Sequence, residues 1–228
     1  MGKRFYRGAT WIVRHFGRRY TTTWEVPFDG EPCVFVGNHA GLWGPVDMVS
    51  SFPLRDEVYP WFNEAVMEKE LVPAYVRQDY WWKPGCRLEP LYNATLPYIA
   101  SWILPPILRS VPGVPVYHDS RVMITMKKSL ELLKQGKHLL IFPEQPSGYR
   151  SHHMWINTGF MNIAPLYKRR TGNDLKFWPV HIDHRKRRFI VSAPVKMDPE
   201  RTLEDQLKEL EDALAYGLRG GKTTDVKD

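Results

Sequence analysis

The 228-residue chain contains only two cysteines, Cys33 and Cys86. Two cysteines in a chain of this length do not form the disulfide framework that holds small secreted domains together. Cys33 opens an apolar segment, so we expect it to be a small buried hydrophobic residue. The scarcity of cysteine favours a reducing compartment, and we expect the protein to be cytoplasmic.

Targeting segments and long apolar runs are also missing. The basic first 20 residues lack the apolar core of a secretory signal peptide. The longest uncharged stretch, Leu91 to Leu108, is interrupted by Pro97, Pro105 and Pro106 and is not expected to span a bilayer alone. We predict broken helices here, either a proline-kinked part of the core or a segment that covers a groove or enters a membrane interface.

The composition is that of a globular protein with a basic surface. Hydrophobic residues make up 43% and charged residues 25% of the chain, which is long enough for one domain with a substantial core. The net charge of +7 favours an anionic partner such as a phospholipid head group or a phosphorylated cofactor. No nucleic-acid-binding module is recognisable, so nucleic acid is not expected as a partner.

Three parts of the chain are distinguished by their patterns. Residues 1–31 are expected to contain a basic, aromatic helix over 1–22, which either lies in a membrane interface or packs on the domain with a solvated face. Residues 32–198 alternate apolar strands with amphipathic helices. Residues 199–228 are expected to form a C-terminal helix and a frayed tail.

This alternation predicts a single α/β domain with a mixed central sheet flanked by helices. The expected strands are Cys33–Gly37, Glu57–Phe62, Val114–Tyr117, His138–Phe142, Phe177–Ile182 and Phe189–Val195. One helix is expected after the glycine-rich turn that follows His39, ending at about Ser51. A second is expected over Glu64–Leu71, capped by Asn63 and ended by Pro73. Two more are expected over Arg121–Lys134 and from Pro199 onward.

The pair Asn38-His39 follows the first apolar strand. A histidine that leaves a buried strand at a turn is well placed to act as a general base. Such a base usually needs a carboxylate to hold its tautomer, and the nearest downstream acid is Asp47, eight positions on.

Four segments stand in an ordered series: residues 35–39 (Phe-Val-Gly-Asn-His), 113–118 (Gly-Val-Pro-Val-Tyr-His), 140–144 (Leu-Ile-Phe-Pro-Glu) and 178–182 (Trp-Pro-Val-His-Ile). This series resembles the glycerolipid acyltransferase family, the PlsC-like lysophosphatidate acyltransferases. The resemblance covers about residues 32–198. It implies a glycerolipid-acyltransferase-like fold and an enzyme of phospholipid biosynthesis.

The resemblance implies that His39 removes the proton from an acceptor hydroxyl, which then attacks the thioester of acyl-CoA or acyl carrier protein. No metal or other cofactor is implied. The family's orienting aspartate falls at Gly44, so that acid is absent from its usual place. Asp47 could replace it if residues 40–46 form a longer loop, and Asp119 or Glu144 are alternatives. Otherwise His39 is a turn histidine in a protein that has lost acyl transfer.

Substrate-binding residues follow from the same resemblance. Glu144 matches the family glutamate that positions the acceptor. The family has two phosphate-binding arginines. His118 stands at the position of one of them, with Arg121 three residues further along the chain. Arg150 is the nearest counterpart of the other and is displaced by three residues. We therefore expect Glu144, His118, Arg121 and Arg150 to contact a lysophospholipid or related acceptor.

Two further histidines, His181 and His184, flank Asp183. No third ligand with suitable spacing follows, so we expect no metal there. The basic run 184–188 is predicted to form a solvated hairpin turn, which could also bind phosphates. The sequence thus predicts an acyltransferase that is peripheral on the inner face of the membrane, with membrane lipids and the acyl donor as partners. The alternative is a non-catalytic lipid- or membrane-binding protein on the same fold.

Overall fold

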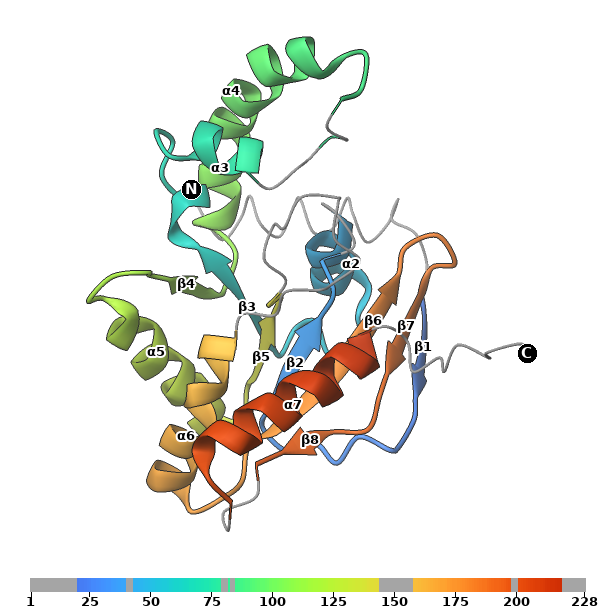
Figure 1. Cartoon of the computed structure of the whole chain (residues 1–228), viewed down its shortest axis with the longest axis vertical. Helices are drawn as coiled ribbons and strands as arrows, with labels where there is room; N and C mark the ends of the chain where they lie inside the picture. The colour runs from blue at the N-terminus through green and yellow to red at the C-terminus, as the bar shows by residue number, and fades with distance from the viewer. Residues whose placement is uncertain are drawn as a thin grey trace.

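A mixed eight-stranded sheet forms the centre of the protein (Figure 1). The computed structural model describes residues 20–39, 43–78, 82, 85–143, 158–197 and 201–218. The strand order is β1-β7-β6-β2-β5-β3-β4, with β8 beside β6. The predicted α/β fold, with a mixed sheet flanked by helices, is confirmed.

The strands are β1 (Thr21–Trp24), β2 (Cys33–Gly37), β3 (Val58–Asn63), β4 (Val114–Val116), β5 (His138–Ile141), β6 (Lys176–Asp183), β7 (Arg188–Val191) and β8 (Val195–Lys196). The α-helices are α2 (Trp43–Ser51), α3 (Val72–Gln78), α4 (Glu89–Leu108), α5 (Val122–Lys134), α6 (Ile163–Thr171) and α7 (Leu203–Leu218). Two short 3-10 helices are η1 (Glu64–Val66) and η2 (Thr158–Asn162). The predicted strands are all present, although the one predicted over Phe189–Val195 is divided into β7 and β8. β1, α3, α6 and η2 were not predicted.

Five neighbouring strands of the sheet, from β6 to β4, run in the same direction. β2 is parallel to both β5 and β6, and β3 is parallel to both β5 and β4. Their carboxyl ends therefore meet at one edge of the sheet, which we call the carboxyl edge. The segments that carry His39, His118 and His184 leave the sheet there.

Both faces of the sheet are covered, which explains the continuous apolar runs in its central strands. Alternate residues of β2 point to opposite sides, so Val34 and Val36 pack in one core while Cys33 and Phe35 pack in the other. Helices α5, α6 and α7 cover the first face, and α2 covers the second (Figure 1).

Residues on both sides of the segment 32–198 also pack in the sheet domain. Thr21–Trp24 is a strand that pairs in parallel with β7, so the predicted helix cannot extend to residue 22 and the sheet begins before residue 32. Residues 1–19 lie outside the described residues. Helix α7 is also part of the domain, because Leu210, Leu214 and Leu218 are buried against the sheet.

Helices α3 and α4 form an arm that projects from the sheet (Figure 1). The helix predicted over Glu64–Leu71 is wrong, since Asn63 caps only the short η1, through a bond of 2.9 Å from Ala65 N–H to its Oδ1. Pro73 does not end a helix but lies in the first turn of α3. Proline is tolerated there because the first backbone N–H groups of a helix have no partner within it.

Helix α4 is continuous where broken helices were predicted. Pro97 lacks an N–H and leaves the carbonyl of Asn93 without its helical donor. Arg77 fills this role, because its Nη2 donates to the Asn93 oxygen at 3.3 Å. Among the helices that the structure describes, none is long and apolar enough to cross a membrane.

Candidate functional site

Asn38 fixes the point at which the chain leaves the sheet. Its Oδ1 accepts the Ile182 N–H at 2.6 Å, and its Nδ2 donates to the Ile182 carbonyl at 3.3 Å. The side-chain amide therefore continues the β2–β6 ladder for one step beyond Gly37. This contact fixes the point at which the turn that carries His39 begins.

His39 lies half-buried at the carboxyl edge. Its imidazole packs edge-on against the ring of Phe142, just after β5, with 5.4 Å between the ring centroids. A Cβ on Gly37 would come within 2.9 Å of the Phe142 ring. Glycine at position 37 therefore leaves room for the ring that supports His39.

Gly44 closes the turn after His39. Its N–H donates to the His39 carbonyl at 3.0 Å, and a Cβ at this position would lie 2.2 Å from the same oxygen. This backbone has no space for any side chain at residue 44. The position that matches the family's aspartate is thus one that only glycine can occupy in this turn.

Asp47 lies in α2, and the residue is 6% exposed. Its Oδ2 accepts the Tyr20 hydroxyl at 2.6 Å and the Nδ1 of His184 at 2.7 Å. The Tyr20 oxygen also lies 3.0 Å from His184 Nδ1. Within the described part of the chain, Asp47 thus pairs with His184 and Tyr20, and the predicted pairing with His39 is not found.

This pairing determines the tautomer of His184. Because a carboxylate only accepts, this bond places a proton on Nδ1 of His184. The arrangement has the base-plus-orienter chemistry that was expected of His39. It joins three elements, because Tyr20 precedes β1, Asp47 lies in α2 and His184 follows β6.

Sequence reasoning missed Tyr20 and His184. Asp47 lies 27 residues from the first and 137 from the second, so no short motif links them. The basic hairpin turn predicted for residues 184–188 is confirmed between β6 and β7. Its first residue, however, turns towards α2, and the side chain of His184 is only 23% exposed.

A second polar cluster lies where β4 ends. The Oδ1 of Asn63 is used by Ala65 N–H, so its Nδ2 donates to Nε2 of His118 at 3.3 Å. Arg121 lies three residues on and forms ion pairs with Asp119 at 2.7 Å and with Glu64 at 2.9 Å. Hydrogen bonds from Arg121 lower the pKa of Asp119 to about 2.

These contacts bear on the predicted phosphate ligands. The guanidinium of Arg121 is already held by two carboxylates, so an incoming phosphate would have to compete with both. Asp119 is engaged by Arg121, which leaves it poorly suited to orient His39. Glu144 and Arg150 lie outside the described residues.

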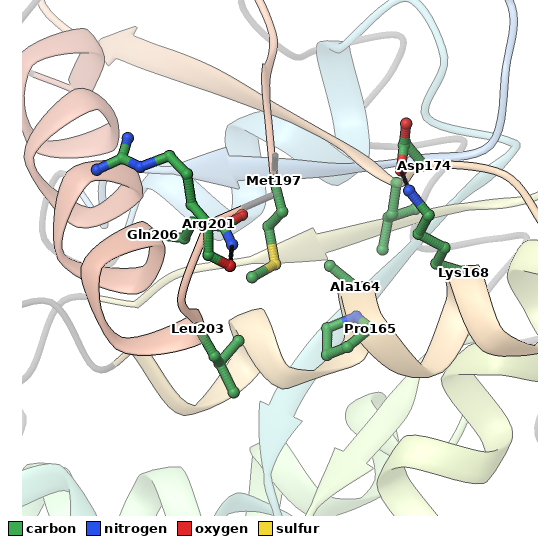
Figure 2. Close-up of a pocket in the computed structure, with 9 residues that line it drawn as sticks. Ala164, Pro165, Lys168, Asp174, Met197, Arg201, Leu203 and Gln206 are labelled. Atoms are coloured by element: carbon green, nitrogen blue, oxygen red, sulfur yellow. Dashed lines mark hydrogen bonds and ion pairs between the residues drawn. The ribbon is translucent and has the colours of Figure 1, made fainter. Parts of the chain in front are cut away.

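A small cavity of about 150 Å³ is lined by none of these histidines (Figure 2). It is lined by Ala164, Pro165, Lys168, Asp174, Leu175, Met197, Arg201, Leu203 and Gln206. Leu175 immediately precedes β6, which places the cavity at the amino end of that strand. In the described ranges, no three His, Cys, Asp or Glu side chains are grouped so as to hold a metal ion.

No protein-family model matches the chain, and no curated protein matches it significantly. The resemblance to the glycerolipid acyltransferases therefore depends on the motifs quoted above.

Proposed function

We propose that the protein is an acyltransferase with a glycerolipid-acyltransferase-like fold. It would move a fatty acyl group from acyl-CoA or acyl carrier protein to the hydroxyl of a lysophospholipid or related lipid, as a peripheral protein on the inner face of the membrane. The observation that best supports this proposal is that His39 and His184 follow two neighbouring parallel strands at one edge of the sheet, beside a buried carboxylate. Ligand sites of open α/β sheets lie at this edge.

The reaction requires one proton transfer at the acceptor. A histidine takes the hydroxyl proton while the acceptor oxygen forms a bond to the thioester carbonyl carbon. The C–S bond then breaks, and the leaving thiolate receives the proton. The acyl ester and a free thiol are the products, so atoms and charge balance without a metal or redox cofactor.

We assign proton abstraction to His39, on the motif, and a positioning role to the Asp47–His184 pair. The pair ties α2 to the β6–β7 turn. Helix α2 in turn holds the His39 carbonyl through the N–H of Gly44. A shift of α2 would therefore move the backbone that carries His39.

Release of free thiol from acyl-CoA tests the proposal, with the full chain and a panel of lysophospholipid acceptors. His39→Ala should lower kcat by about 10²- to 10⁴-fold, the usual contribution of a general base. His181→Gln is the matched control, because His181 also lies near this end of β6 but bonds the Leu218 carbonyl in α7, at 2.7 Å. The control should retain activity within a few-fold.

The competing function is a non-catalytic lipid- or membrane-binding protein on the same fold. Two observations favour it: Asp47 is paired with His184, and Arg121 is paired with two carboxylates. This alternative would be established if the wild type binds vesicles but releases no thiol with any acceptor, and if His39→Ala behaves in the same way. Loss of thiol release in His184→Ala but not in His39→Ala would instead move the base to His184.

A further inference from the structure

Helix α4 exposes an unusually apolar surface for a helix at the outside of a protein. Between Glu89 and Arg109 the sequence contains no charged residue. Large apolar side chains on its outer face are half or more exposed, up to 70% for Trp102. We call this set the α4 patch; its members are Leu91, Tyr98, Ile99, Trp102 and Ile103.

The patch lies on one side of the helix. Tyr98 and Trp102 are four residues apart, as are Ile99 and Ile103, which stacks each pair on successive turns. The opposite side, with Pro97 and Ala100, is buried in the arm. The α4 patch is therefore not part of a core, because α4 already packs its inner face on α3.

The arm has its own small core, separate from the two cores of the sheet. Val72 and Val76 of α3 pack with Ala100 of α4, and Trp82 and Leu104 lie against them. The arm projects from the sheet (Figure 1). The exposed residues of the α4 patch therefore belong to none of the three cores.

Two cations lie against the aromatic rings of the patch. Lys69 Nζ is 3.1 Å from the centroid of the Trp102 ring. Arg77 lies 5.5 Å from the Tyr98 ring centroid, and its Nη2 is 3.4 Å from the Tyr98 hydroxyl. Aromatic rings flanked by long basic side chains are typical of the membrane interface, where the ring lies at head-group depth and the charge reaches the phosphates.

We propose that the α4 patch is a docking surface for an anionic phospholipid membrane. Helix α4 lies in the plane of the interface, with Ile99, Trp102 and Ile103 among the upper acyl chains. Lys69 and Arg77 face the lipid phosphates. The docking surface deepens the proposed function by naming where the protein meets the membrane that holds its acceptor, and it applies equally to the non-catalytic alternative.

Charge favours a lipid surface over a second copy of the chain. The charged groups that the structure records against the patch rings are both cations, and the whole chain carries +7. In a two-fold contact through the patch, the same surface of each copy meets its equivalent. Such a contact would bring cations towards cations, whereas lipid phosphates compensate them.

Vesicle flotation tests the proposal, with the full chain and vesicles of phosphatidylcholine containing about a third phosphatidylglycerol. The double variant Ile99→Asp/Trp102→Asp should bind at least about tenfold more weakly than the wild type. Tyr216→Asp, at a 53% exposed aromatic residue of α7, is the matched control and should float as the wild type does. Lys69→Gln should weaken binding at low salt more than at high salt.

Circular dichroism and thermal unfolding verify that each variant is folded. The proposal is overturned if the wild type does not float, or if the folded double variant floats as well as the wild type. It is also overturned if light scattering shows a lipid-free dimer that the double variant abolishes. Thiol release with a water-soluble short-chain acceptor separates the two proposals. Patch variants should keep that activity, whereas His39→Ala should lose it and still float.

Discussion

Histidines lie at both ends of the parallel strands, and their environments are opposite. His138 begins β5 at the amino end, is 3% exposed, and packs between the rings of Phe28 and Phe35. Burial lowers its pKa below the ordinary value. His39 and His184 follow the carboxyl ends of β2 and β6, are less buried, and His184 has a carboxylate partner. The same residue type is a core residue at one end and a candidate for chemistry at the other.

The difference comes from what covers each end. At the amino end, the segment before β2 closes the sheet, with Phe28 packed on the core and Lys176 paired with Asp29 and Glu31. At the carboxyl edge, α2 is the next described element after β2. Asn38 and His39, which follow β2, are half-buried there. Among the described histidines, His39 and His184 at the carboxyl edge are thus only partly buried, whereas His138 at the amino end is enclosed by the core.

The strongest way to break the carboxyl edge is to add a side chain at Gly44. Gly44→Ala should lower the free energy of unfolding by about 2–4 kcal/mol, because its Cβ would overlap the His39 carbonyl. Gly44→Asp, which restores the acid at the family position, should destabilise the protein and not raise acyl transfer. Val46→Ala, at an exposed residue of the same helix, is the control for denaturant unfolding. A stable and more active Gly44→Asp protein would contradict this account of the turn.

The partner of Asp47 is tested next, by double-mutant cycles. Asp47→Asn should lower the free energy of unfolding by about 1–3 kcal/mol, since a buried charged hydrogen bond is lost. Combined with His184→Gln, it should show a coupling energy of about 1 kcal/mol or more. Combined with His39→Gln, the effects should add. Coupling to His39 but not to His184 would restore the pairing expected from the sequence.

The smallest effect concerns the amino end. The lowered pKa of His138 means that, as pH falls below about 6.5, the unfolded chain takes up a proton before the native protein does. The contribution of His138 to stability is thus complete above that pH. It is lost as the pH falls towards the pKa that His138 has in the native protein. His138→Leu should reduce the loss of stability between about pH 7.5 and about pH 5.5, measured by denaturant unfolding. An unchanged pH dependence in this variant would show that His138 is not held neutral by the core.

Much of the fold could be predicted because the strands are apolar on both faces. A run such as residues 33–37 has few alternatives to a buried strand, and Gly136 ends the predicted helix before β5. The arm is predicted poorly from the sequence because a proline in a helical pattern usually indicates the end of the helix. Pro73 begins a helix, and Pro97 stays within one because Arg77 compensates the freed carbonyl.

The sequence by itself determined the central strands, the exit of His39 from β2 and the absence of an acid at residue 44. These are local properties, set by apolar periodicity and by neighbours along the chain. Only the tertiary structure decided which side chain Asp47 holds. That choice depends on β6 lying beside β2, so that His184 returns to α2 after 137 residues, and on Tyr20 at the start of β1. The tertiary structure also decided that the α4 patch is exposed, because α3 packs only on the side of α4 that carries Ala100.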